Sequence, residues 1–182
     1  TKKLYSGEKG IEVIPCFYKM TYPEWAPFDR SEGRPVHNDR GPAVMAQTTK
    51  GSGTKDVLAN GNEIIKTANH FVVILGDKPE KALMSLKTTQ LKTSRGWNSL
   101  MDNEMITSST GKSIPAPAFS RVYKINSVEN TGNFTWHGMT VNLVRPVDNA
   151  EIYSMAKDFN NALQKSNVAA ASVETNTEES NY

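Results

Sequence analysis

Residues 87–101 read Lys-Thr-Thr-Gln-Leu-Lys-Thr-Ser-Arg-Gly-Trp-Asn-Ser-Leu-Met, and they separate two blocks of strand-like sequence. Four positions recur at the spacing of one helical face: Leu91, Ser94, Trp97 or Asn98, and Met101. Gly96 lowers helix propensity by about 1 kcal/mol relative to Ala, but the periodicity still predicts a short helix. The segment carries three cations and no carboxylate, so we expect a basic, hydroxyl-rich side that faces a partner.

Strand patterns flank this predicted helix. Residues 11–22 are rich in β-forming side chains, and Pro15 predicts that at its own position this strand is at a sheet edge or bulged. Residues 70–76 form a continuous apolar run, which predicts a strand buried on both faces, and residues 81–88 return as the second arm of a hairpin. Residues 119–128 and 134–144 predict another hairpin.

An amphipathic helix closes the body of the chain. Asp148 is a predicted N-cap with Glu151 three residues later, and an apolar stripe follows at helical spacing. Residues 166–182 contain few large apolar side chains and are predicted to be disordered. The sequence therefore predicts an OB-like domain over residues 1–165 and a disordered acidic tail over residues 166–182.

This order of elements is that of an OB fold. We expect a mainly β protein with an OB-fold-like five-stranded barrel, a helix between strands 3 and 4, a closing C-terminal helix and a disordered tail. The 182-residue chain has room for such a core.

The charge, the cysteine content and the apolar runs of the chain exclude only a few classes of protein. The net charge is +2, but three of the 19 acidic residues lie in positions 174–182, so the remaining chain has 21 basic and 16 acidic residues and a charge of +5. The single cysteine, Cys16, excludes an intramolecular disulfide and favours a reducing compartment. No apolar run approaches 18 residues, which predicts no membrane association through a helix.

The sequence contains no catalytic signature. Ser109–Ser113 resembles the end of a phosphate loop, but Ile106 stands where that motif requires Gly. The three histidines are far apart, so no metal site and no cofactor are expected. Asp29, Glu32 and Asp39 alternate with arginines, which is typical of a solvated loop. We therefore expect a protein that is not an enzyme.

Aromatic and basic side chains are interleaved along the predicted strands, which is the pattern of a surface that stacks bases and neutralises phosphates. The alternative is that most of these rings pack the core. The tail ends in an aromatic residue and carries Glu174, Glu178 and Glu179, so it could contact a basic groove or a partner, or only increase solubility.

With these features the chain resembles the single-stranded DNA-binding proteins of tailed phages. The resemblance rests on the order of elements over residues 11–165 and on the tail ending in Tyr182. It implies sequence-independent binding of single-stranded DNA in phage replication or recombination, in the cytoplasm of the host cell. It also implies replication proteins as partners of the tail residues Glu174, Glu178, Glu179 and Tyr182. A homodimer is left open.

The predicted DNA-binding residues fall into two groups. For base stacking we expect Trp25, Trp97, Tyr123 and Trp136, although Trp97 could instead belong to the core. For phosphate contacts we expect Lys87, Lys92, Arg95 and Lys124. Two other classes of protein stay open: a phage capsid or tail accessory protein, and a small DNA-processing enzyme built on Asp29, Glu32 or Asp39.

Overall fold

A computed structural model describes residues 5–53, 55–131 and 135–179 of the chain, with side chains up to residue 167. The chain divides into two compact units. Unit 1 contains Thr1–Phe17, Phe71–Ala82 and Trp97–Tyr182, and unit 2 contains Tyr18–His70 and Leu83–Gly96. The division falls within three strands and one helix, so neither unit is a continuous segment of chain.

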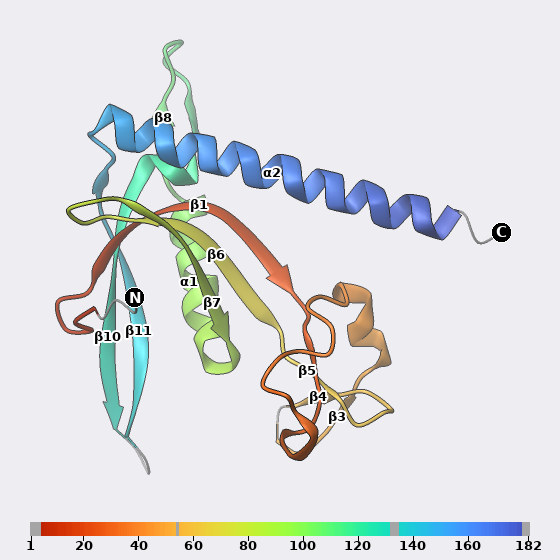
Figure 1. The fold of residues 1–182 in the computed structure, drawn as a ribbon. Coiled ribbons are helices and arrows are strands. Elements are labelled where there is room, and N and C mark those ends of the chain that lie inside the picture. Colours follow the sequence, from red (N-terminus) through yellow and green to blue (C-terminus); the bar gives the residue numbers. More distant parts are fainter. Residues whose placement is uncertain (1–4, 54, 132–134, 180–182) are drawn as a thin grey trace. The chain divides into compact units, whose positions relative to one another are not determined.

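The main sheet is antiparallel and five-stranded, and its strands follow the order β11-β10-β1-β6-β7 (Figure 1). The strands are β1 (Ile11–Thr21), β6 (Thr67–Ile74), β7 (Glu80–Lys87), β10 (Arg121–Thr131) and β11 (Thr135–Pro146). These confirm the five predicted strands and both predicted hairpins. The expected barrel is wrong in one respect, because the sheet is open and has β11 and β7 as its two edges.

The N-terminal strand β1 lies inside the sheet, between β10 and β6, and not at its edge. The prediction from Pro15 concerns only that position, where the pairing of β1 with β10 has already ended. The pairs between β1 and β10 run from Ile11 to Val13 and stop before Pro15. The missing N–H of Pro15 consequently removes no bond on the β10 side.

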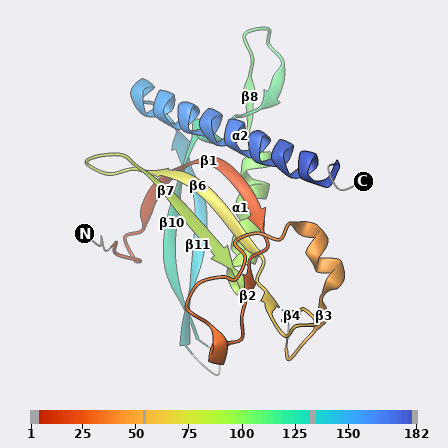
Figure 2. The ribbon, with the colours of Figure 1, turned by 45° about the vertical axis from the view of Figure 1, so that its right-hand side comes forward.

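The predicted helix is α1 (Leu91–Asp102), and a 3₁₀ turn, Thr88–Gln90, leads into it. In chain order α1 follows the third strand of the main sheet and precedes the fourth, as the sequence predicts. A two-stranded hairpin of β8 (Met105–Thr107) and β9 (Ser113–Pro115) comes between α1 and β10. Figures 1 and 2 show this hairpin extending away from the rest of unit 1.

Helix α2 (Ala150–Glu179) confirms the predicted C-terminal helix, but its cap is different. The side-chain oxygen of Asn149 accepts hydrogen bonds from the N–H groups of Glu151 and Ile152, at 2.9 and 3.0 Å. Asn149 is therefore the N-cap in place of Asp148, a role typically worth about 1 kcal/mol. Within the predicted disordered stretch, side chains from residue 168 onward and residues 180–182 lie outside the described part of the chain.

The core of unit 1 packs α2 onto one face of the main sheet. Five buried residues form it: Ile14, Cys16, Val73, Val122 and Ala156. Apolar side chains of α2, including Ile152 and Phe159, contact this cluster and confirm the predicted apolar stripe. The amide of Asn160 also donates a hydrogen bond to the carbonyl of Cys16, which fixes α2 along the strand.

The opposite face of the sheet in unit 1 is covered by Trp97 of α1. Its ring packs edge-to-face on Tyr123, with the ring centroids 6.0 Å apart. Val13 pairs with Tyr123 across β1 and β10, and because opposite residues share a face, Val13 belongs to this second layer. Unit 1 therefore has a helix on each side of its part of the sheet.

Unit 2 has a smaller sheet of its own, in the order β2-β5-β4-β3. Each of its strands has two residues: β2 (Glu24–Trp25), β3 (Thr49–Lys50), β4 (Asp56–Val57) and β5 (Glu63–Ile64). The 3₁₀ helices Phe28–Arg30 and Pro42–Gln47 interrupt the chain between β2 and β3. Val44, Leu58 and Ile64 are buried together beneath this sheet and contact Tyr22 and Met45.

Candidate nucleic-acid interface

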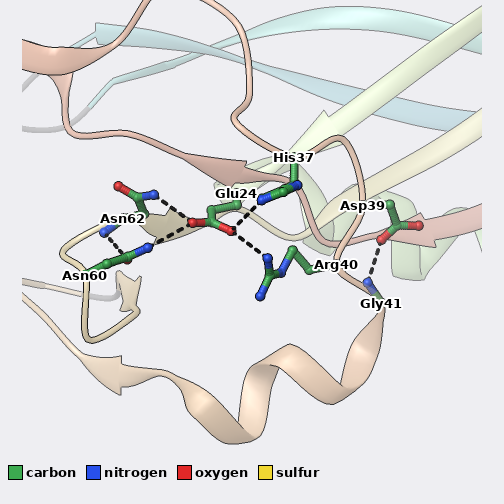
Figure 3. A network of polar contacts seen from close by, with 7 residues as sticks. All are labelled: Glu24, His37, Asp39, Arg40, Gly41, Asn60 and Asn62. Carbon is green, nitrogen blue, oxygen red and sulfur yellow. Dashed lines mark hydrogen bonds and ion pairs between the residues drawn. The ribbon is translucent and has the colours of Figure 1, made fainter. Parts of the chain in front are cut away.

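A buried carboxylate, Glu24, organises the loop region of unit 2 (Figure 3). Only 3% of Glu24 is exposed. Its Oε1 accepts hydrogen bonds from the amides of Asn62 and Asn60, at 2.6 and 3.2 Å. Its Oε2 lies 3.4 Å from Arg40 Nη1 and 3.9 Å from His37 Nε2. One side chain therefore joins the loop after β2 to the turn between β4 and β5.

These neighbours keep Glu24 ionised. Burial alone would raise the pKa of the Glu24 carboxyl, because the charged form loses its hydration. The hydrogen bonds from Asn62 and Asn60, together with the nearby side chains of Arg40 and His37, outweigh burial and hold the pKa below its ordinary value. Both oxygens of the carboxylate are occupied by these neighbours. We therefore infer that Glu24 holds the loop in position.

Backbone bonds extend this arrangement along the loop. The N–H of Glu24 donates to the carbonyl of His37 at 2.9 Å, and the N–H of Val36 donates to the carbonyl of Glu24 at 2.7 Å. Farther on, one carboxylate oxygen of Asp39 accepts from the N–H groups of Tyr22 and Gly41, at 2.9 and 3.0 Å. The long charged loop is solvated as predicted, and it is tied to β2 through Glu24 and to the chain just before β2 through Tyr22.

Trp25 follows Glu24 in β2, and the pairing with β5 fixes both residues. Glu24 pairs with Ile64 and Trp25 with Glu63. Successive side chains of a strand point to opposite faces, so anchoring Glu24 directs the Trp25 ring away from the carboxylate. The ammonium of Lys87 lies over this ring, 4.9 Å from its centroid. The structure therefore brings together two of the residues predicted to bind DNA.

The cations around α1 differ from the other lysines of unit 2 in their partners. Lys87, Lys92 and Arg95 have no ion pair to any acidic side chain that the structure describes, and Lys92 and Arg95 are exposed. By contrast, Lys50 pairs with Asp56 at 2.5 Å and Lys55 with Glu63 at 2.6 Å. Of these two groups, the first offers a phosphate positive charge that no described acidic side chain neutralises.

A cleft of about 470 Å³ lies in the same unit. Its lining includes the paired lysines together with the chain that leads into α1: Lys50, Lys55, Lys66, Thr88, Thr89 and Leu91. Thr88 has a φ of 48°, a left-handed conformation that is uncommon for a residue other than glycine. This strained residue lies at the turn from β7 into the basic start of α1.

Two of the predicted stacking residues belong to the core. Trp97 is 1% exposed and Tyr123 is fully buried, and each covers the other's ring edge. Burial raises the pKa of the Tyr123 phenol to about 12, and the nearby charge of Glu104 adds to this. Neither ring has a face open to a base, so we correct their assignment from DNA contact to packing. The alternation of apolar residues could not distinguish the two roles.

The other two predicted residues in unit 1 lie on the β10–β11 hairpin. Lys124 is half-buried in β10 and pairs with Glu12 on one side and Asn142 on the other. Trp136 is exposed near the start of β11, opposite Asn130. Six residues separate Asn142 from Trp136, about 20 Å along a strand, so these two predicted contacts lie far apart on one hairpin.

Three further expectations concern groups that could bind metals or act as nucleophiles. His70 and His137 lie in strands, and His37 lies in the loop. Cys16 is buried, and burial raises the pKa of its thiol to about 12, as suits an apolar core residue. Among the described residues, no group of three or more His, Cys, Asp or Glu side chains is placed to hold a metal ion.

Sequence reasoning missed Glu24 and its amide partners. The available signal was a lone carboxylate between Pro23 and Trp25, in an otherwise apolar and aromatic segment that begins with Tyr22. A charge at such a position requires partners when it is buried. Asn60 and Asn62 flank Gly61 in a turn, where asparagines usually indicate only the turn itself.

Comparison with known proteins places the chain in a family. A family model described as Pam3 phage gp34-like protein matches residues 1–169. The chain therefore belongs to the Pam3 phage gp34-like family, and it is a phage protein. No curated protein and no solved structure gives a match. Neither α-helix in the described part of the chain has the length and apolar composition that a membrane crossing requires.

Proposed function

We propose that this phage protein binds single-stranded DNA without sequence preference and without catalysing a reaction, during replication or recombination of phage DNA. One observation carries the proposal. The Trp25 ring and the Lys87 ammonium are in contact, and Lys87 begins a short segment whose three cations have no acidic partner among the described residues. We call this set, Trp25, Lys87, Lys92 and Arg95, the Trp25 surface.

The chemistry of the Trp25 surface suits a nucleic-acid strand. An aromatic ring stacks on any base, because every base has a π face, and cations neutralise the phosphates between bases. Lys87 now covers one face of the ring. A base that stacks there displaces the ammonium, which then reaches a backbone phosphate. The contact between Trp25 and Lys87 is in this way replaced by two contacts with one nucleotide: the ring stacks on the base, and the ammonium pairs with the phosphate.

Glu24 supports this role by fixing the ring. Strand β2 has only two residues, so its position depends on the bonds of Glu24 to Asn60, Asn62 and Arg40. A stacking residue must be held in place before the base arrives, because ordering it during binding reduces affinity. The buried carboxylate therefore acts as a positioning group.

Charge removal at matched positions tests the proposal. We compare Lys92→Ala/Arg95→Ala with Lys50→Ala/Lys55→Ala in titrations of labelled oligo-dT at low and moderate salt. Both variants lose two cations, but only the first pair is free of acidic partners. The first variant should bind more weakly, and its plot of log K against log salt should flatten by about 1.4, at roughly 0.7 per lost phosphate contact. The control should bind nearly as wild type.

Stacking is tested separately with Trp25→Ala and Trp25→Phe. Losing a stacked base costs about 1–3 kcal/mol, so Trp25→Ala should weaken binding roughly 5- to 150-fold, while Trp25→Phe should retain most of the affinity. Wild-type protein that ignores oligo-dT at low salt, or that binds it equally at both salt concentrations, would refute the proposed function. Equal losses of oligo-dT affinity in the two double-alanine variants would refute the assignment of DNA binding to the Trp25 surface.

A further inference from the structure

The cleft of about 470 Å³ in unit 2 contains more positive than negative charge. Three lysines line it, Lys50, Lys55 and Lys66, together with two carboxylates, Asp56 and Glu63. Lys50 lies 2.5 Å from one oxygen of Asp56, and Lys66 lies 3.9 Å from the other. These two lysines share one carboxylate, so three ammonium groups face two carboxylates and the lining has a net charge of +1. We call this feature the lysine cleft.

The lysines of the lysine cleft are far more exposed to solvent than the carboxylates that pair with them. The exposed fractions of the Lys50, Lys55 and Lys66 side chains are 69%, 56% and 40%. Those of Asp56 and Glu63 are only 12% and 24%. An anion that approaches from solvent therefore meets the ammonium groups first. Because the carboxylates already hold these groups in place, less side-chain entropy is lost when the anion binds.

The chain between β7 and α1 adds hydroxyl groups to the lysine cleft. Thr88 and Thr89 both line it and are exposed. The left-handed φ of Thr88, 48°, is a conformation that proteins often retain at ligand sites. Glycine adopts such a φ without strain, so the chain keeps a hydroxyl here in spite of the backbone cost. Hydroxyl and ammonium groups are donors that the oxygens of a phosphate accept.

The lysine cleft adjoins the Trp25 surface at two places. Glu63 lines the cleft and is the β5 residue opposite Trp25, and opposite residues of an antiparallel pair have Cβ atoms about 4.5–5.5 Å apart. Thr88 directly follows Lys87, whose ammonium lies over the Trp25 ring. A nucleotide that stacks on Trp25 therefore has the cleft within reach of its own phosphate.

The ion pairs in the lysine cleft determine which kind of phosphate it suits. A phosphate inside a DNA strand carries one negative charge, as does the carboxylate that already pairs with each lysine, so exchanging one for the other gains little. A terminal phosphomonoester carries a charge of about −1.5 to −2 at pH 7 and has three strong acceptor oxygens. The cleft therefore favours a phosphomonoester over a phosphodiester.

We propose that the lysine cleft binds the terminal phosphomonoester of a DNA strand whose end nucleotide stacks on Trp25. This inference rests on the proposed function, and it adds recognition of a strand end to binding without sequence preference. The three lysines pair with the phosphate, and Thr88 and Thr89 donate hydrogen bonds to it. Oligo-dT with hydroxyl groups at both ends has no such phosphate and does not use the cleft. A 5′-phosphate and a 3′-phosphate offer the same chemistry, and titration separates them.

The test is titration of the full chain with oligo-dT of one length, with hydroxyl ends, with a 5′-phosphate or with a 3′-phosphate. Wild type should bind one of the phosphorylated forms about tenfold more tightly than the hydroxyl form. Methylation of the terminal phosphate leaves a single charge and should abolish this gain. Thymidine 5′-monophosphate that binds as tightly as the phosphorylated oligonucleotide would assign the cleft to free nucleotides and overturn recognition of a strand end.

Three variants locate the bound phosphate. Lys50→Ala/Lys55→Ala should lose the preference for a phosphorylated end. Thr88→Gly keeps the backbone conformation without strain and removes one hydroxyl, so it should lose part of the preference while its thermal stability stays nearly unchanged. The matched control, Lys112→Ala/Lys165→Ala, removes two exposed lysines outside the cleft and should keep the preference.

The outcomes separate this inference from the proposed function. Wild type that binds oligo-dT but does not distinguish phosphorylated from hydroxyl ends would overturn the inference and leave the proposed function standing. Wild type that ignores every oligonucleotide at low salt would refute both. A preference that survives in Lys50→Ala/Lys55→Ala, or that is lost equally in Lys112→Ala/Lys165→Ala, would overturn the assignment to the lysine cleft.

Discussion

His70 lies in β6 with almost no exposed surface, and its Nε2 is 2.8 Å from the hydroxyl of Ser94. The ring also packs against Tyr18, with the centroids 5.0 Å apart. Burial lowers the pKa of the His70 imidazole to about 4, because the protonated form loses its hydration. At neutral pH this histidine is therefore an uncharged core residue.

The depressed pKa of His70 predicts that the protein loses stability in mild acid. The unfolded chain takes up a proton near pH 6.5 and the folded one only near pH 4. The stability that depends on a neutral His70 is thus complete above pH 6.5 and declines as pH falls toward 4, by about 3 kcal/mol at most. Urea unfolding of wild type and His70→Gln at pH 7.5, 6 and 5 measures this.

We expect the His70→Gln variant to be less stable but nearly insensitive to pH over this range. Glu24 does not confuse the comparison, since its pKa is held below an ordinary value of 4.5 and its contribution is lost only in stronger acid. A variant with the same pH dependence as wild type would show that His70 is not the responsible group.

Individual side chains were the least predictable from sequence. Trp25, Trp97 and Trp136 all follow patterns compatible with a groove or a core, yet Trp97 is buried and Trp136 exposed. What decides between them is the neighbour across the sheet or helix, here Tyr123 for Trp97 and an open edge for Trp136. Such partners are distant in sequence, so local periodicity contains no information about them.

At the scale of elements, β2 is too short to hold its place by backbone pairing alone. It makes two pairs with β5 and backbone bonds to His37 and Val36, and the side chain of Glu24 adds hydrogen bonds from Asn60 and Asn62. Replacing this carboxylate with an amide keeps one acceptor oxygen but removes the charge and sets an NH2 donor against other donors, and breaking one partner of a buried charged pair typically costs several kcal/mol.

Glu24→Gln should therefore destabilise the protein by about 2–4 kcal/mol and loosen its loop. The amide hydrogens of Glu24 and Val36, which bond to the loop and to β2, should exchange faster with deuterated solvent. Glu32→Gln is the matched control, because Glu32 pairs with Arg34 at 2.7 Å on the surface. Exchange at residues 24 and 36 that is unchanged in Glu24→Gln would contradict the anchoring role.

The long elements were predictable because each repeats its pattern several times. The run at residues 70–76 and the apolar stripe after residue 150 identify β6 and α2. The β8–β9 hairpin and the strand β2 were missed, since two or three residues do not establish a period. The weak alternation over residues 56–66 predicts a single strand, and the structure has two there, β4 and β5. The short strands of unit 2 depend on turns and on the bonds of Glu24 instead.

At the scale of the whole molecule, the tail at residues 174–182 is acidic, and the rest of the chain has a net positive charge. We propose that the tail, through Glu174, Glu178, Glu179 and Tyr182, competes with DNA for the basic surface until a replication protein binds it. Glu174→Gln/Glu178→Gln/Glu179→Gln should then bind oligo-dT severalfold more tightly at low salt, and the gain should disappear at high salt because the competition is screened.

The matched control is Glu129→Gln/Glu151→Gln/Asp158→Asn, which removes three exposed acidic charges from the body and leaves the tail intact. Its net charge changes equally, so a difference between the two variants isolates the position of the charge. The same gain in both would attribute the effect to net charge and refute competition by the tail.

The global arrangement was only partly predictable. Strand number, the place of α1 and the closing helix follow from the order of elements along the chain. Whether the sheet closes into a barrel cannot be predicted in this way. A barrel requires β7 to pair with β11, and no local pattern specifies that pairing. The division into two units was equally hidden, since each is assembled from separated segments.

The central position of β1 has a consequence for how the chain is made. Ile11 pairs with Ile125, which is 114 positions later in the sequence. At a synthesis rate of about 5–20 residues per second, β1 leaves the ribosome roughly 6 to 23 seconds before this partner does. Strand β1 must therefore wait for the synthesis of 114 further residues, with β6 as its neighbour in the meantime, before the sheet can be completed.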